Sequence, residues 1–129
     1  MLLETVIIEL PLTNNNSGQG RAWYQSHKER LAFEQAFAMR EGGKSLPYLQ
    51  PVSLHVVRCY TGRGRAWDAD NLLRGNSKQL IDAMVSAGWF LDDNTKHIEQ
   101  VVGSQEKVDR ERDCIRVEIH SKQARFPDD

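Results

Sequence analysis

The chain has 129 residues, of which 40% are hydrophobic and 27% are charged, and its formal net charge is -1. This length and composition predict a single domain over residues 1–129 with a hydrophobic core, and they argue against a disordered chain or a uniformly basic nucleic-acid-binding protein. No hydrophobic run reaches membrane length and no signal peptide opens the chain, so we expect no membrane partner and a cytoplasmic location.

The charge is distributed unevenly along the chain. Residues 1–81 hold ten basic and seven acidic groups, whereas residues 82–129 hold seven basic and eleven acidic groups. A basic first part and an acidic second part remain compatible with DNA binding. Cys59 and Cys114 lie in strand-like runs without metal-ligand spacing, which indicates buried free thiols and fits a reducing cytoplasm.

The chain begins with a predicted strand and a polar loop. Residues 4–10 have the alternation of a strand, and Pro11 ends it. Residues 13–20 (TNNNSGQG) have the composition of a loop, because Asn, Ser and Gly favour turns. The loop is either a plain connection or a segment whose side-chain amides and glycine backbone contact phosphates or a metal site.

A predicted helix and a second predicted strand follow. Residues 21–41 carry an apolar stripe at helical spacing, and two glycines end this helix. Residues 52–60 alternate as a half-buried strand, in which His55 is more typical of a strand surface than of a metal ligand. The next turn places Arg63 and Arg65 beside two glycines, and it is either a phosphate-contacting lip or a simple exposed hairpin turn.

Paired acids flank the next predicted helix. Asp68 and Asp70 are two residues apart, so their side chains point the same way in an extended chain. A helix predicted over residues 72–87 then leads to Asp92 and Asp93. Converging carboxylates repel one another unless a cation lies among them, and all-oxygen ligands favour Mg²⁺ or Mn²⁺ over zinc. The pattern therefore predicts a metal site.

Simpler interpretations of these residues remain open. An EF-hand loop is excluded because leucines and a glutamine occupy the positions of its third ligand, its glycine and its glutamate. Asp70 or Asn71 could instead cap the helix. Lys78 and Asp82 lie one helical turn apart, so Lys78 could also be a solvated lysine paired with Asp82.

The last part of the chain predicts two strands, at residues 97–103 and 113–121, joined by a hairpin connection over residues 105–112. The predicted fold class is therefore α+β, in the order strand, helix, strand, helix, strand, strand. We expect a mixed β-sheet covered by the two helices.

The acidic stretch resembles the RusA-like Holliday junction resolvases (crossover junction endodeoxyribonucleases). The resemblance rests on the order D-x-D-N, a lysine, D-A-hydrophobic before A-G, and hydrophobic-D-D. These features are matched by Asp68, Asp70, Asn71, Lys78, Asp82, Ala83, Met84, Ala87, Gly88, Leu91, Asp92 and Asp93. The first strand with L-P-L-T-N-N-N is similar to the family's strand followed by P-x-S-x-N. Together these elements cover most of the chain and are far more specific than a lone D-x-D.

The resemblance implies a RusA-like fold and a metal-dependent endonuclease of DNA recombination and repair, in a phage or prophage setting. It would cut branched DNA at four-way junctions and leave 5'-phosphate ends. Asp68, Asp70 and Asp93 would hold Mg²⁺, with Mn²⁺ as a substitute and Asp92 as a further ligand or a support. Lys78 would stabilise the transition state. The expected DNA contacts are Asn16, Arg63, Arg65, Asn71 and Arg74.

One point of this resemblance stays open, the identity of the catalytic cation. Counted back from Asp82, Lys78 is in register with the family's lysine, but counted forward from Asp70, Arg74 takes that place. The difference of four residues means that either the helix starts a turn earlier or residues 74–77 form an extra loop. Two strands of a junction must be nicked and the chain offers one acidic cluster, so we expect a homodimer.

Two other functions also fit parts of the pattern. One is a DNA-structure-binding protein that has lost catalysis, which suits the near-neutral charge but gives no reason to keep four acids. The other is a metal-dependent hydrolase of another phosphodiester, or of nucleotides or sugar phosphates. The chain has no glycine-rich phosphate loop before a helix, which argues against a nucleotide enzyme.

Overall fold

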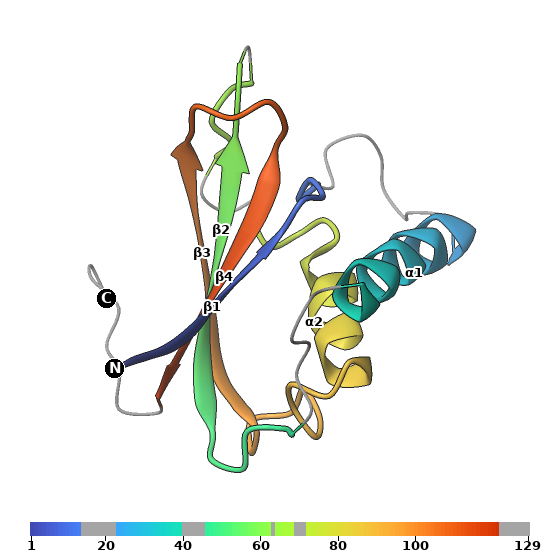
Figure 1. Ribbon diagram of the computed structural model, residues 1–129, viewed down its shortest axis with the longest axis vertical. Coiled ribbons are helices and arrows are strands. Elements are labelled where there is room, and N and C mark those ends of the chain that lie inside the picture. The colour runs from blue at the N-terminus through green and yellow to red at the C-terminus, as the bar shows by residue number, and fades with distance from the viewer. Residues whose placement is uncertain (14–22, 40–45, 63, 69–71, 122–129) are drawn as a thin grey trace.

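The computed structural model describes residues 1–13, 23–39, 46–62, 64–68 and 72–121. Its elements are β1 (Leu2–Ile8), α1 (Trp23–Ala38), β2 (Val52–Tyr60), α2 (Ser77–Ser86), β3 (Ile98–Lys107) and β4 (Cys114–Ser121). The strands form one mixed sheet, and both helices lie on the same side of it (Figure 1). The predicted α+β class and the predicted order of elements are confirmed. Neither helix is long and apolar enough to span a membrane, within the residues that the structure describes.

The strand order in the sheet is β1-β4-β2-β3. β2 pairs with β4 in antiparallel and with β3 in parallel, so it occupies an inner position and is buried along most of its length. The predicted hairpin connection over residues 105–112 is wrong, because β2 lies between β3 and β4. β3 also continues to Lys107, because each residue from Gln100 to Lys107 pairs with a residue of β2, the last of them with Tyr60.

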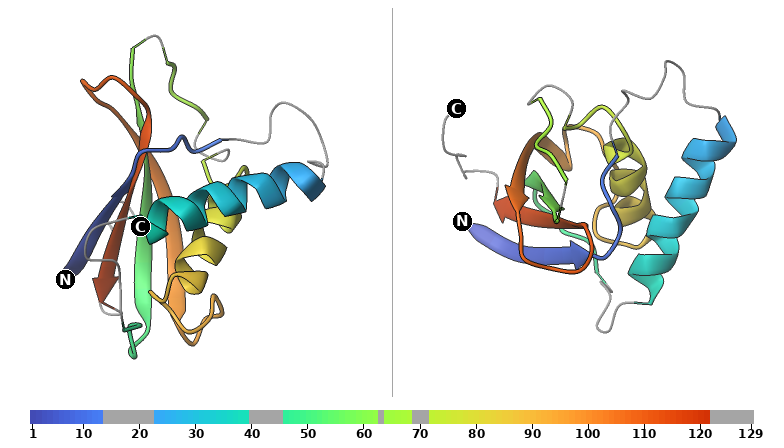
Figure 2. Two further views of the ribbon diagram at one scale, coloured as in Figure 1. Left: turned by 45° about the vertical axis from the view of Figure 1, so that its right-hand side comes forward. Right: turned by 90° about the horizontal axis from the view of Figure 1, so that it is seen from above.

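The core lies between the sheet and the two helices (Figure 2). Alternate residues of the strands point to this side, and α1 and α2 meet them with large apolar side chains. The Phe37 and Trp89 rings pack against each other with their centroids 5.0 Å apart. The side chains that are essentially inaccessible there include Val6, Ile8, Phe33, Phe37, Leu54, Val56, Leu80, Met84, Trp89, Ile115, Val117 and Ile119.

The opposite side of the sheet holds a second, smaller apolar cluster. It consists of Val57, Cys59 and Cys114, with Val108 packed against them. Both cysteines are buried free thiols, as the sequence predicts. Burial raises the pKa of the Cys59 thiol to about 11, and the neighbouring Cys114 adds to this shift.

The start of α2 differs from the prediction. The helix begins at Ser77 instead of residue 72, and residues 72–76 form turns. Asn76 occupies the position before the helix but makes no capping bond with its side chain. Instead, its Oδ1 accepts a hydrogen bond from Thr13 N (2.9 Å) and its Nδ2 donates to Pro11 O (3.3 Å). Residues 72–76 therefore form a loop that is tied to the segment after β1.

Candidate active site

The segment that carries Asp68 is fixed on the helix side of the sheet. Trp67 N donates to Gln105 Oε1 (2.9 Å), and Gln105 Nε2 donates to Trp67 O (2.7 Å). Arg58 Nη1 donates to the backbone oxygen of Arg65 (2.8 Å) and to Gln105 Oε1 (3.0 Å). These bonds hold the backbone on both sides of residue 66, and the exposed Asp68 follows directly.

Arg58 is the anchor of this segment. Its guanidinium carbon lies 3.8 Å from the centre of the Trp67 ring and 4.7 Å from the centre of the Tyr60 ring, close enough for cation–π attraction to both. The side chain is only 5% exposed, and this burial lowers its pKa, although Asp113 acts in the opposite direction. Arg58 therefore holds the segment from Arg65 to Trp67 in place and is not available to bind phosphate.

The loop before α2 is held against β3. A Cβ atom on Gly103 would lie 3.0 Å from Leu73 Cγ and 3.2 Å from Leu72 Cβ, so the absence of a side chain at Gly103 lets the loop approach the sheet. Ser77 Oγ donates to Leu73 O (2.7 Å) and joins this loop to the first turn of α2. Trp67, through Gln105, and the turn at Leu72 and Leu73, through Gly103, are thus both held against β3.

Lys78, in the first turn of α2, lies among acidic groups. Its Nζ is 3.8 Å from Asp93 Oδ2 and 3.8 Å from Asp82 Oδ1. The side chains of Lys78 and Asp93 are 73% and 41% exposed. Both line a pocket of about 230 Å³ whose other walls are Leu73, Ser77, Ile81, Ile98 and Val101. Lysine and carboxylate therefore meet at a solvent-open pocket with an apolar floor.

Asp92 and Asp93 have different surroundings. Asp92 Oδ1 accepts from the backbone N–H of Asp93 (2.7 Å), and Asp92 Oδ2 accepts from Asn94 Nδ2 (3.4 Å). Asn94 Oδ1 in turn accepts from Lys96 N (3.0 Å). Asp92 thus shapes the turn that carries Asp93, the residue whose Oδ2 lies near Lys78 Nζ.

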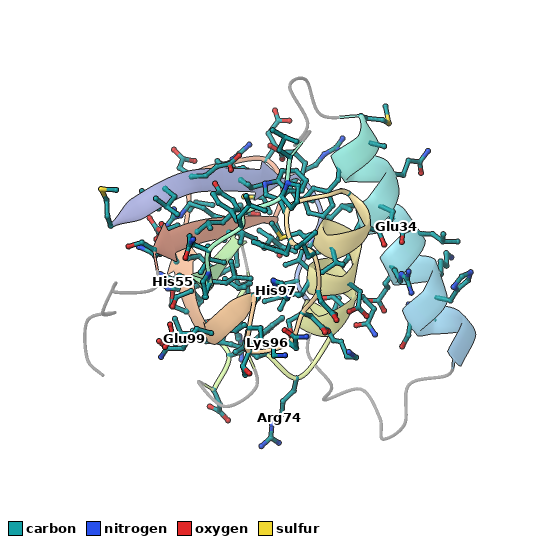
Figure 3. All side chains as sticks on the ribbon, turned by 90° about the horizontal axis from the view of Figure 1, so that it is seen from below. Glu34, His55, Arg74, Lys96, His97 and Glu99 are labelled. Atoms are coloured by element: carbon teal, nitrogen blue, oxygen red, sulfur yellow. The ribbon has the colours of Figure 1, made fainter. Side chains whose placement is uncertain are left out.

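The remaining predicted residues lie in different places. Asn16, Arg63, Asp70 and Asn71 are outside the described residues, so the convergence of Asp70 with the other acids stays a prediction. Asp68, Arg65 and Arg74 are exposed, and Arg74 extends outward from its loop (Figure 3). Of the predicted site residues in the described part of the chain, Lys78 and Asp93 lie next to each other, with 3.8 Å between Nζ and Oδ2.

The donors in this region fit a hard cation. Asp68 and Asp93 offer exposed carboxylate oxygens, the ligand type that Mg²⁺ prefers. The ammonium of Lys78 offsets part of the repulsion between Asp82 and Asp93. Asp93, with the ammonium of Lys78 beside it, therefore has the chemistry to contribute to a Mg²⁺ site.

A second set of potential ligands was missed by the reasoning from sequence. His55, Glu118 and His120 each offer one ligand atom, and these atoms lie within 4.8 Å of one another on the opposite side of the sheet. The strand pattern around His55 favours an ordinary surface histidine. The only signal in the sequence is the spacing Glu-x-His at residues 118 and 120, which puts two ligand types on one face of a strand.

Comparison with known proteins gives no family assignment. No family model matches the chain, and no curated protein is significantly similar to it.

Proposed function

We propose that the protein is a Mg²⁺-dependent endodeoxyribonuclease that resolves four-way DNA junctions by paired symmetric nicks. The observation that carries the proposal is the contact of Lys78 with Asp93, 3.8 Å apart at an open pocket. A RusA-like site would need the lysine and the last acid of the pattern close together, and Lys78 and Asp93 are 15 positions apart in the sequence. The α+β fold and the order of its elements are consistent with this family.

The acidic residues would form the metal site. Asp68, Asp70 and Asp93 would hold Mg²⁺, which would activate a water molecule and polarise the scissile phosphate for in-line attack. Asp92 steadies Asp93 through the backbone N–H of the latter. The hydrogen bonds of Trp67 to Gln105 steady the residue before Asp68. Each described ligand thus follows directly after a residue that is hydrogen-bonded in place.

Lys78 would stabilise the charge that develops on the phosphate. Its contacts with Asp82 and Asp93 are longer than a hydrogen bond, and most of the side chain is exposed, so the ammonium can turn toward a bound phosphate. Arg74 leaves the loop outward, which suits a contact with the DNA backbone more than catalysis. This geometry supports Lys78 over Arg74 as the catalytic cation.

Further cations would contact DNA around the acids. The backbone of Arg65 is held by Arg58 and its side chain is exposed three residues before Asp68. Arg63, Asn71 and Asn16 are proposed to add contacts from neighbouring segments. One acidic cluster per chain and two nicks per junction call for two copies, so the active form would be a homodimer.

The test is a cleavage gel with purified protein on a four-way junction, a linear duplex and a flap, with Mg²⁺ or a chelator. We expect symmetric nicks on the junction that require Mg²⁺. Asp70→Asn should abolish cleavage while junction binding survives or tightens. The variant lacks one carboxylate, so it repels the DNA phosphates less than the wild type does. The control Glu34→Gln, an acid on α1 paired with Arg30, should cleave as the wild type does.

Other outcomes would contradict the proposal. Junction binding by the wild type without cleavage would favour a DNA-structure-binding protein. Cleavage of duplex and junction alike would favour another phosphodiester hydrolase. Loss of binding together with cleavage in folded Asp70→Asn would contradict its assignment as a metal ligand.

A further inference from the structure

Three side chains with metal-binding groups gather on the sheet face that the helices leave uncovered. His55 of β2 and Glu118 of β4 are direct partners in the antiparallel pairing, and His120 lies two residues after Glu118. Residues two apart on a strand share a face, so the register alone brings all three together. Figure 3 shows His55 on the side of the sheet turned away from α1, on which Glu34 is labelled.

The distances suit a small divalent ion. His55 Nδ1 lies 3.3 Å from Glu118 Oε1, and His120 Nε2 lies 3.6 Å from the same oxygen. A tetrahedral zinc ion with bonds of about 2.1 Å separates its ligand atoms by about 3.4 Å. Two edges of such a tetrahedron are therefore present already, and the third, within 4.8 Å, can close by rotation of an imidazole.

Neighbouring residues orient two of the three ligands. His55 Nε2 lies 2.6 Å from Ser104 Oγ, and if this nitrogen donates its proton there, Nδ1 keeps its lone pair for a metal. Arg116 Nε donates to Glu118 Oε2 (3.0 Å), which leaves Oε1 to the histidines. The charge of Arg116 is shared with Glu106, whose Oε2 accepts from Arg116 Nη2 (2.8 Å). Such outer contacts are a regular feature of protein metal sites.

The donor types select the ion. Two imidazole nitrogens and one carboxylate oxygen suit Zn²⁺ and its neighbours among the transition metals, whereas Mg²⁺ prefers oxygen alone. The three side chains are 23%, 22% and 18% exposed, so an ion can enter from solvent and a water molecule can complete its coordination. Three protein ligands with a fourth position open is a common arrangement for zinc.

We infer that His55, Glu118 and His120 form a site for Zn²⁺ or a similar transition-metal ion, separate from the proposed Mg²⁺ site. The ion would join β2 to β4, two strands that lie next to each other in the sheet. The inference does not depend on nuclease activity, because none of its ligands belongs to the acidic cluster around Lys78. Bound zinc would therefore stabilise the fold whether or not the protein cuts DNA.

The test is titration of tag-free, metal-stripped full-length protein with ZnCl₂ in a calorimeter, with MgCl₂ as the comparison. We expect one zinc per chain, a higher Tm with zinc, and no displacement of zinc by millimolar Mg²⁺. His120→Gln and Glu118→Gln should each weaken zinc binding at least tenfold. His27→Gln, which changes an exposed histidine on α1, is the matched control and should bind as the wild type does. Asp93→Asn should also keep the zinc affinity, because Asp93 lies at the other site.

Cobalt gives a readout that needs no variant. Co²⁺ in place of zinc should produce the intense visible absorption of a four-coordinate ion with nitrogen ligands. Weak absorption typical of six oxygen ligands, or no stoichiometric zinc binding to the folded wild type, would overturn the inference. Zinc affinity that falls in His27→Gln or Asp93→Asn but survives in folded His120→Gln would move the ion elsewhere and would also overturn it.

Discussion

Asn76 holds together two segments that are 63 residues apart in the sequence, and Asn76→Ala should expose its contribution to stability. The side chain accepts from Thr13 N and donates to Pro11 O, while the residue is only 3% exposed. Each lost bond costs about 1 kcal/mol net, and a stranded buried group costs about 1–3 kcal/mol more. Thr13 is half-buried, so water can reach part of this region and reduce the penalty. We therefore expect a loss of about 2–3 kcal/mol in the free energy of unfolding.

The assay is urea unfolding followed by tryptophan fluorescence and far-UV circular dichroism. At a slope of about 1–2 kcal/mol per molar urea, the midpoint should fall by about 1–3 M. Asn94→Ala is the matched control, since Asn94 also accepts from a backbone N–H (Lys96) and donates to an oxygen (Asp92), but is exposed. Its cost should stay below about 1 kcal/mol. Equal costs for the two variants, or a cost below about 0.5 kcal/mol for Asn76→Ala, would refute the reasoning.

Three further predictions concern catalysis, pH and assembly. Lys78→Ala should lower the single-turnover rate by about tenfold to a thousandfold with little change in junction binding. Arg74→Ala should mainly weaken junction binding. The reverse pattern would give Arg74 the catalytic role. The folded protein holds the Cys59 proton up to a pKa of about 11, above the ordinary thiol value of 9.0, so the unfolded chain loses its proton first and stability should fall as pH rises between these values. Urea unfolding from pH 8 to 10.5 should show this slope, and Cys59→Ala should flatten it; an equal slope in both proteins would assign it to other groups. Light scattering should give about twice the 14.8 kDa chain mass, and paired nicks should linearise a supercoiled cruciform; a stable monomer that nicks one strand would defeat the resolvase proposal.

The strands were predictable because their signal is local. The strand predicted over residues 52–60 has the same bounds as β2, although β2 is buried on both faces and the prediction of a half-buried strand is wrong. The start of α2 was not predictable, because Leu72 and Leu73 suit a helix as well as they suit a loop packed on Gly103. The choice between these is made by contacts with β3 and with the segment after β1, which no local pattern contains.

The position of β3 in the sheet was missed for a similar reason. Consecutive strands often pair as hairpins, and nothing near residues 105–112 signals an exception. β2 is apolar on both of its faces, which is typical of an inner strand with a neighbour on each side. Such a clue says that β2 is inner but does not say which strands flank it.

The candidate site was predictable only where residues are close in sequence or match the order of residue types in a known family. Lys78 and Asp82 are neighbours on one helix, and the resemblance to resolvases added Asp93. Arg58 was not found, because an arginine in a strand gains its role from Trp67 stacking on it and from Gln105 on the next strand. A residue that acts by positioning others has no pattern of its own in the sequence.

The two proposed metal sites follow from the alternation of one strand. In β2, Arg58 points toward the helices and supports the segment that leads to Asp68, while His55 points to the other side and meets Glu118. Because successive side chains alternate between faces, a shift of register by one residue would exchange these environments. Such a shift would place the Arg58 charge on the sheet face that the helices leave uncovered. It would place His55 under the helices, far from any carboxylate of β4. The buried apolar residues of β2 and β4 fix the register against that shift. The core that stabilises the fold therefore also keeps the ligands of the two proposed metal sites on opposite sides of the sheet.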